Sequence, residues 1–350
     1  MEIPHVSRVF SFRTMQSFHE MRSFHTNHVN EGAYGNVQEP PGACGTPVNL
    51  LAAAGGVVIV ACVTDVADSE RLDCVPDEVL AAFGVAGAVP VRLAGGQGTA
   101  WRAGQAVLKP ADSVRAGRWF AEVYDTLSGP GFRVPRPVRS ATGDWVALGW
   151  TACQWVPGAA ADWAGDSPRW PEMVAVSRAL HAALAGVPVP SWRAAEENPW
   201  TIGDEVAWGE RDPGPLLGPA AGPLAAPVGR LLAALRPVDL PGQLVHADLG
   251  GNVLFADGLP PAVIDFSPLA RPAGLPLAVA AVDALMWRRA RPELLRHLAG
   301  ERELDQLLAR ALVYRLVTEI VRHAGTAGVD ADARAAAPVT DLVLARLLAG

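Results

Sequence analysis

Residues 246–266 alternate short apolar runs with polar loops, a pattern typical of strands connected by turns. Asp248 and Asn252 lie in the first loop, and Asp265 lies in the second. Asp, Asn and Gly are also common in ordinary turns. Phosphoryl transfer, however, needs one carboxylate to orient a hydroxyl nucleophile, and an Asn with a second carboxylate to bind Mg²⁺ on nucleotide phosphates. The second Asp therefore favours a reactive site over a plain turn.

The one lysine of the chain is a second candidate. Lys109 stands alone among 29 Lys and Arg residues and ends the strand-like run Val107-Leu108-Lys109. Arg does not replace Lys where a compact point charge is needed, so the retained lysine is predicted to contact phosphate groups. A surface lysine at a strand end is the competing explanation.

A glycine-rich turn precedes this lysine. It consists of Gly95, Gly96, Gly98 and Thr99, with Gln97 between the glycines. Glycines allow backbone N–H groups to approach phosphate oxygens, but a hairpin turn also uses glycine. The P-loop pattern that ends in Gly-Lys-Ser/Thr is absent, so a Walker-type nucleotide site is not expected.

Three further residues are candidates for nucleotide contacts. Glu122, on a predicted helix over 114–127, is the carboxylate available to position Lys109, although it lies off the apolar stripe and a solvated role competes. Gln154 and Val156 lie in an extended segment that joins two parts of the chain. Their backbone groups are predicted to meet an adenine edge, with a plain connection as the alternative.

The pattern along the chain predicts three regions. Residues 1–75 read as a poorly ordered N-terminal extension, 76–156 as a small sheet with one helix, and 157–350 as a mostly helical region that carries the Asp-bearing loops. Apolar periodicity predicts helices over 77–83, 114–127, 171–184, 277–289, 303–323 and 340–348. Strand-like runs cover 89–93, 106–108 and 145–156. The expected class is α+β.

Charge and composition exclude several partners. The net charge is −7, and no Lys or Arg run with interleaved aromatics occurs, whereas nucleic-acid binding needs a basic surface. The apolar run at 50–63 is 14 residues long, shorter than the ~20 that span a membrane.

The four cysteines lack metal-ligand spacing, and reduced thiols in a cytoplasm are the simplest interpretation. The oligomeric state stays open.

Taken in order, these residues resemble the aminoglycoside phosphotransferase and choline-kinase-like family, over about 76–350. The matching pieces are the glycine turn at 95–98, Lys109, Glu122, residues 155–158, His246-x-Asp248, Asn252 and residues 264–266. The resemblance implies a bilobal protein-kinase-like fold with a small antiparallel-sheet N-lobe and a larger helical C-lobe.

The resemblance also implies a role for each residue. Asp248 would be the catalytic base, Asn252 and Asp265 the Mg²⁺ ligands, and Lys109 the phosphate-binding lysine with Glu122 as its ion-pair partner. His246 would brace the catalytic loop, and Asp283 would have a structural role.

Two departures from the family pattern stand out. Asn252 follows Asp248 by four positions, one fewer than is usual in the family, and Asp265-Phe266 continues as Ser267-Pro268 rather than with an acidic or glycine-containing segment.

The implied activity is transfer of the γ-phosphoryl group of ATP to a hydroxyl of a small molecule, aminoglycoside-like or another hydroxylated metabolite. Carboxylates and tryptophans within 196–210 suit a cationic acceptor, although a solvated acidic loop has the same composition. The shortened loop motivates the alternative, a nucleotide-binding pseudokinase with a regulatory or scaffold role.

Overall fold

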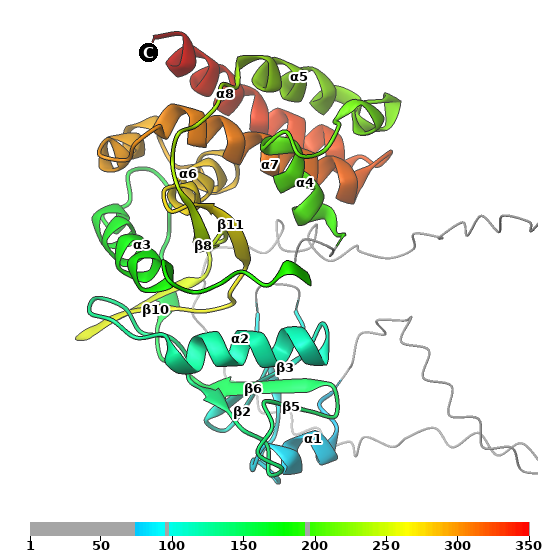
Figure 1. Ribbon diagram of the computed structural model, residues 1–350, viewed down its shortest axis with the longest axis vertical. Helices are drawn as coiled ribbons and strands as arrows, with labels where there is room; N and C mark the ends of the chain where they lie inside the picture. Colours follow the sequence, from blue (N-terminus) through cyan, green and yellow to red (C-terminus); the bar gives the residue numbers. More distant parts are fainter. Residues whose placement is uncertain (1–73, 95–97, 193–196, 350) are drawn as a thin grey trace, which may run out of the picture. The chain divides into compact units, whose positions relative to one another are not determined.

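The computed structural model describes residues 74–94, 98–192 and 197–349 (Figure 1). Nearly all of the predicted N-terminal extension, 1–75, and the turn residues Gly95 and Gly96 lie outside the described residues. The described chain forms two compact units, the first from residues up to 114 with 138–152, and the second from 115–137 with 153 onward. The domain limits at 75 and 156 stay predictions.

The first unit is built on a sheet with strand order β1-β2-β3-β6-β4, in which β5 also pairs with β6. The strands are β1 Val91–Arg92, β2 Trp101–Ala103, β3 Ala106–Pro110, β4 Pro137–Val138, β5 Val146–Ala147 and β6 Trp150–Gln154. Helix α1, Asp77–Ala82, begins after Pro76 and has two acidic residues in its first turn, where carboxylates favour the helix dipole. Its Val79 and Leu80 pack with Trp101, Leu108 and Trp150 in a small core.

The apolar run at 145–156, predicted as one strand, is two strands joined by a tight turn. Leu148 and Gly149 both have positive φ, 52° and 77°, between the paired residues Ala147 and Trp150. Positive φ at both central positions defines the type I′ turn that suits two-residue hairpins. Strand β2 was not predicted, because three residues beside a glycine carry little periodicity.

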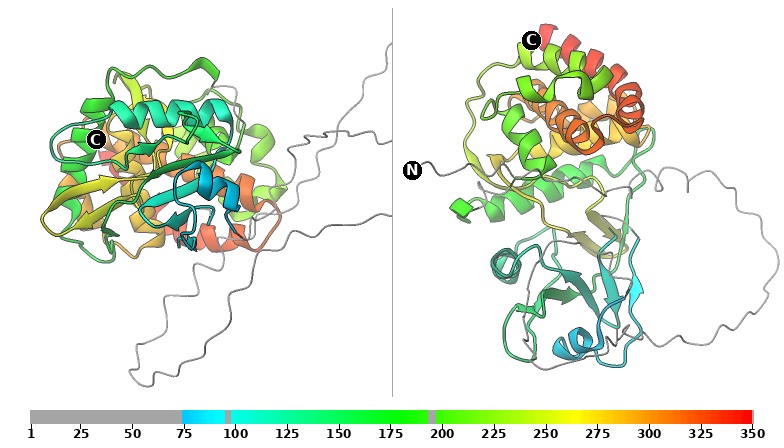
Figure 2. Two further views of the ribbon diagram at one scale, coloured as in Figure 1. Left: turned by 90° about the horizontal axis from the view of Figure 1, so that it is seen from below. Right: turned by 90° about the vertical axis from the view of Figure 1, so that its right-hand side faces the viewer.

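The second unit is mostly helical. Its helices are α2 Val114–Thr126, α3 Trp170–Leu184, α4 Pro199–Ala207, α5 Ala225–Ala234, α6 Leu275–Trp287, α7 Leu304–His323 and α8 Gly328–Ala349, with short 3₁₀ turns η3 Gly214–Leu216, η4 Pro219–Leu224 and η5 Pro292–Leu298. Helix α7 is the centre of this unit: it contacts α4, α5, α6 and α8, and Figure 2 shows α7 in orange beside α8 in red. Sixteen of its residues are buried.

Three small strand pairings hold the polar loops of this unit. Strand β8, Gly242–His246, pairs antiparallel with β11, Pro268–Pro272, so that His246 lies opposite Pro268. Strand β9, Val253–Ala256, pairs with β10, Leu259–Val263, and with β7, Ala159–Ala160. The predicted α+β class, with antiparallel sheets and a larger helical part, is confirmed. Among the described residues, no helix is long and apolar enough to cross a membrane.

Candidate active site

The pairing of β8 with β11 brings the two Asp-bearing loops together. The first loop leaves β8 after His246 and contains Asp248 and Asn252; the second enters β11 and contains Asp265. Ala247 N donates to Ser267 O at 2.8 Å, and Ile264 N donates to Asn252 O at 2.9 Å. Backbone hydrogen bonds thus join the loops at both ends.

His246 connects the same loops through its side chain. Its Nε2 lies 2.9 Å from the carbonyl oxygen of Ile264, while Nδ1 faces the N–H groups of Asp248 at 3.3 Å and Ser267 at 3.4 Å. A carbonyl only accepts and an N–H only donates, so the imidazole is neutral and carries its hydrogen on Nε2. Burial lowers the pKa of His246, consistent with that form. The side chain braces both loops, as predicted.

A second buried histidine, His181, bonds the backbone of His246. His181 on α3 accepts the backbone N–H of His246 through Nε2 at 3.1 Å, and its Nδ1 lies 3.2 Å from Ser177 Oγ. Burial, followed by the neighbouring His246, lowers the pKa of His181 to about 3. The ring of His181 must be neutral because Nε2 can accept this hydrogen bond only when it carries no hydrogen. This role of His181 was not predicted, since a histidine on a helix face is ordinarily a core residue.

Asp248 is held by a neighbouring arginine and is still partly exposed. Its Oδ1 accepts from Arg315 Nη2 at 3.0 Å, and 40% of its side chain is exposed. Trp163 Nε1 donates to the carbonyl oxygen of Gly250 at 2.7 Å, which fixes the middle of the same loop. The loop is therefore anchored by side chains from distant parts of the unit, while the carboxylate stays accessible.

Arg315 links Asp248 to Asp283. Arg315 Nε and Nη2 donate to the two carboxylate oxygens of Asp283 at 2.7 and 2.5 Å. Burial works against a guanidinium charge, yet the carboxylates of Asp283 and Asp248 raise the pKa of Arg315 well above its usual value. A fork-shaped guanidinium can bond both acids at once. Sequence reasoning expected a structural role for Asp283 and missed Arg315.

Asn252 has an arrangement that suits a metal ligand. Its Nδ2 donates to the backbone oxygen of Asp248 at 2.8 Å and lies 3.4 Å from Asp248 Oδ2. With the amide nitrogen used for the loop, the amide oxygen is the atom that can face a cation. Asp265 is exposed and has a φ of 52°, a left-handed conformation that Asp tolerates better than most residues. Amide and carboxylate oxygens are the donors that Mg²⁺ prefers.

The remaining predicted residues lie outside this pair of loops. Lys109 is half-buried in β3, where Thr151 Oγ1 donates to its carbonyl oxygen at 3.2 Å. Gly98 has a φ of 68°, and Thr99 follows it. Lys109, Gly98 and Thr99 belong to the first unit, and their nucleotide contacts stay predictions.

Glu122, Gln154 and Val156 belong to the second unit. Glu122 is exposed on α2, in the other unit from Lys109, so the predicted ion pair between them stays a prediction. Gln154 N donates to the carbonyl oxygen of Arg136 at 2.8 Å, and Val156 is half-buried two residues later. Their predicted contacts with an adenine edge stay predictions too.

The acidic segment after residue 196 is paired with arginines. Asp204 and Glu210 both bond Arg271, at 2.7 and 2.6 Å, while Glu205 and Glu197 bond Arg211, at 2.6 and 3.1 Å. Asn198 caps helix α4 by accepting from Trp200 N and Thr201 N. These carboxylates are already neutralised, so the geometry does not favour this segment as a cation-binding surface.

Comparisons with known proteins identify the family of the chain. The sequence signature of the phosphotransferase enzyme family (APH) matches residues 91–270. A search of curated protein sequences finds no match.

Two solved structures have a similar fold. The apo form of a thermostable mutant of aminoglycoside phosphotransferase APH(4)-Ia is 18% identical with a TM-score of 0.51, covering 77% of this chain and 99% of that chain. The AMP-bound complex of spectinomycin phosphotransferase APH(9)-Ia is 12% identical with a TM-score of 0.51, covering 77% and 97%. These likenesses confirm the predicted protein-kinase-like fold. Because the family signature covers more than half of its residues, the chain belongs to the phosphotransferase enzyme family.

Proposed function

We propose that this protein transfers the γ-phosphoryl group of ATP to a hydroxyl group of a small molecule. The observation that carries the proposal is the state of Asp248: Arg315 holds Oδ1 at 3.0 Å while the side chain remains 40% exposed. A carboxylate that is held in place and is still accessible to solvent can orient an incoming hydroxyl. Positioning and electrostatic stabilisation supply most of the catalysis in this reaction class.

In the proposed reaction, the acceptor hydroxyl donates a hydrogen bond to Asp248. Its oxygen forms a bond to the γ-phosphorus, the bond to the bridging oxygen of ADP breaks, and Asp248 takes the hydroxyl proton. The pairing with Arg315 holds the Asp248 carboxylate in one orientation. Orientation matters more than strong basicity in this reaction, because the transition state is loose.

Asn252 and Asp265 are the proposed ligands of Mg²⁺. The hydrogen bond from Asn252 Nδ2 to the backbone oxygen of Asp248 orients the side-chain amide, so that its oxygen is the atom that can coordinate a cation. Asp265 supplies an exposed carboxylate from the joined loop. When bound, Mg²⁺ neutralises charge on the phosphate oxygens. Lys109 is proposed to contact the nucleotide phosphates, and the AMP-bound spectinomycin phosphotransferase supports a nucleotide ligand for this fold.

The same hydrogen bond favours the enzyme over a nucleotide-binding pseudokinase. The pseudokinase interpretation rests on the short spacing between Asp248 and Asn252. Despite that spacing, Asn252 reaches back to the loop and Asp248 keeps its accessible carboxylate. Binding of Mg-ATP without turnover on any acceptor would instead indicate the pseudokinase.

The acceptor class is best tested without assuming a positive charge, since the carboxylates at 197–210 already pair with arginines. ATP turnover is measured against a panel that includes aminoglycosides, spectinomycin-like aminocyclitols, amino alcohols and neutral sugars. At least one hydroxylated compound should stimulate ADP release and appear as its phosphorylated product.

The decisive variant is Asp248→Asn, which keeps the shape of the side chain but removes its charge. It should lower kcat by roughly 10²–10⁴-fold, the usual contribution of a positioned acid or base. Asp257→Asn, in the exposed turn between β9 and β10, is the matched control and should leave kcat unchanged. Equal turnover by wild type and Asp248→Asn would refute the assignment.

A further inference from the structure

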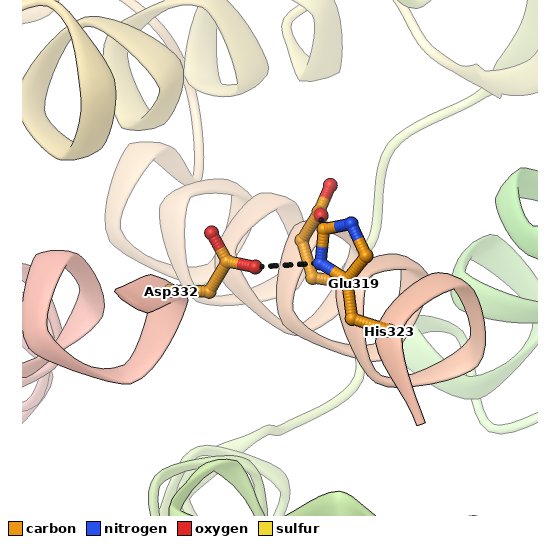
Figure 3. A group of neighbouring side chains, drawn as sticks. All are labelled: Glu319, His323 and Asp332. Carbon is orange, nitrogen blue, oxygen red and sulfur yellow. Dashed lines mark hydrogen bonds and ion pairs between the residues drawn. The ribbon is translucent and has the colours of Figure 1, made fainter. Parts of the chain in front are cut away.

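We propose that Glu319, His323 and Asp332 form a binding site for a divalent transition metal of the zinc type, at the junction of α7 and α8. Glu319 and His323 lie one helical turn apart on α7, a spacing that puts both side chains on one face. Asp332 comes from the beginning of α8, after the chain reverses direction. Figure 3 shows both carboxyl groups beside the imidazole.

The distances fit a single ion. His323 Nδ1 lies 3.0 Å from Asp332 Oδ2 and 3.3 Å from Glu319 Oε2, and one ligand atom from each residue lies within 4.8 Å of the others. Nitrogen and oxygen ligands bind zinc at about 2.0–2.2 Å in a tetrahedral arrangement, which places neighbouring ligand atoms about 3.4 Å apart. The two distances from His323 Nδ1 therefore differ from the spacing of a bound ion by a few tenths of an ångström.

Burial makes this group of acids unusual. Asp332 is fully buried, and 9% of the Glu319 side chain is exposed. Both carboxylates face the same nitrogen, which can carry at most one hydrogen. Burial raises the pKa of Glu319, opposed by the charge of Arg322. A divalent cation would interact with both carboxylates and with the bare nitrogen of a neutral imidazole.

The surroundings hold the ligands in place. Arg322 Nη1 donates to both oxygens of Glu319, at 3.0 and 3.3 Å. The imidazole of His323 packs on Gly328, where a Cβ atom would lie 2.8 Å from Cγ and 2.9 Å from Nδ1. Outer hydrogen bonds and tight packing of this kind orient metal ligands.

The donor set indicates which metal the site would take. One imidazole nitrogen with two carboxylate oxygens suits zinc and its first-row neighbours, whereas Ca²⁺ and Mg²⁺ prefer oxygen ligands alone. Three protein ligands leave a fourth position for water. The adjoining turn at 324–327 is exposed, and 19% of the His323 side chain is exposed as well. The competing explanation is a protonated His323 that bridges the two carboxylates as an ion pair.

The test uses full-length protein that has been stripped of metal by a chelator and then titrated with Zn²⁺ or Co²⁺. Histidines and cysteines elsewhere in the chain can also bind metal, so the readout is the difference between variants. His323→Ala and Asp332→Asn should each remove one equivalent of binding, with at least about 100-fold weaker affinity for that equivalent. The tetrahedral d–d absorption of bound Co²⁺ should disappear with it.

The matched control is His297→Ala. His297 Nε2 lies 3.7 Å from Asp166 Oδ1 and is not part of the cluster, so this variant should bind metal as the wild type does. Identical stoichiometry and affinity in wild type, His323→Ala and Asp332→Asn would show that the cluster is a buried ion pair only.

Thermal unfolding of the wild type gives a second measurement, which does not depend on folding of the variants. Saturating Zn²⁺ should raise the Tm of the stripped protein if the metal binds the folded chain preferentially. An unchanged Tm together with no Co²⁺ d–d absorption would overturn the proposal. Neither measurement depends on phosphotransferase activity.

Discussion

Arg315 on α7 donates to Asp248 Oδ1 at 3.0 Å while it bonds both oxygens of Asp283. Arg315→Met should therefore lower kcat more than it raises KM, because the orientation of the proposed base is lost. Arg315→Lys should recover only part of the rate, since one ammonium cannot reproduce the forked contacts. Steady-state kinetics on the best acceptor measures both effects.

A second substitution separates positioning from stability. Arg315→Met leaves Asp283 without its cation, and breaking a buried ion pair costs about 3–5 kcal/mol. Adding Asp283→Asn should restore most of the Tm but not kcat. Recovery of both in the double variant would show that Arg315 acts on stability alone.

Asn252 gives a prediction about metal dependence. Asn252→Ala should raise the Mg²⁺ concentration that gives half-maximal rate, because an oxygen ligand is removed. Asn198→Ala is the control: it removes the cap of α4 and should cost about 1 kcal/mol of stability without changing the Mg²⁺ requirement. Rates measured across Mg²⁺ concentrations at fixed ATP distinguish the two. The same Mg²⁺ curve for wild type and Asn252→Ala would remove Asn252 from the proposed ligands.

Lys109 gives a prediction about the nucleotide. Lys109→Met should weaken ATP binding and lower kcat, since the charge on the phosphates is lost. Lys109→Arg should restore ATP binding incompletely, because guanidinium and ammonium differ in shape and hydration. Calorimetry with ATP measures the affinity directly, and Arg102→Met on the neighbouring strand β2 serves as control. Unaltered ATP affinity in Lys109→Met would rule out the assignment.

The helices and the local motif could be predicted from the sequence, but the partners of the motif could not. Apolar periodicity predicts α7 almost to the residue, and the spacing of Asp248, Asn252 and Asp265 is visible within 20 residues. Arg315 lies 67 positions from Asp248. The residues around a buried arginine in a helix do not indicate which distant carboxylate it will bond.

Helix α8 shows a second reason why the sequence does not predict the whole fold. Its predicted extent, 340–348, covers less than half of Gly328–Ala349, because Pro338 lies inside the helix. A proline lacks the N–H of the helix ladder and usually ends a helix. Tertiary packing against α7 overrides that preference, and the sequence around Pro338 does not predict this packing.

Two glycines in helices should respond oppositely to alanine. At Gly203 on α4, a Cβ atom would lie 2.5 Å from Tyr314 O and 2.6 Å from Thr318 Oγ1. Gly203→Ala should therefore destabilise the chain by about 1–3 kcal/mol. Gly229 on α5 has no atom within 4 Å of the same position, and Gly229→Ala should stabilise the chain by up to about 1 kcal/mol. Urea unfolding checks both; equal effects would contradict the close approach of α4 to α7.

Stability should also depend on pH through His181. Its pKa is about 3 in the folded chain, and a histidine in an unfolded chain titrates near about 6.5. The folded state thus binds fewer protons between these values. The contribution of His181 to the free energy of unfolding is fully present above about pH 6.5. It is lost as the pH falls, at up to about 1.4 kcal/mol per pH unit.

The matching variant is His181→Gln, which cannot titrate. Its free energy of unfolding should fall less steeply between pH 6.5 and pH 4 than that of the wild type, although the neutral His246 still contributes a slope. Urea unfolding at several pH values measures the difference. Parallel curves would show that His181 does not titrate with folding.

Helix α7 carries Arg315, Glu319 and His323 along one side. Arg315 bonds Asp283 on α6 and His323 bonds Asp332 on α8. Inserting or deleting one residue between positions 315 and 323 would rotate everything beyond it by about 100°. Such a change would separate the arginine from the cluster at the end of the helix, whatever residue was added. A change of length in the exposed turn at 324–327 would leave that alignment intact. Such a change would instead move Asp332 relative to His323, so insertions in the helix and in the turn would have different effects.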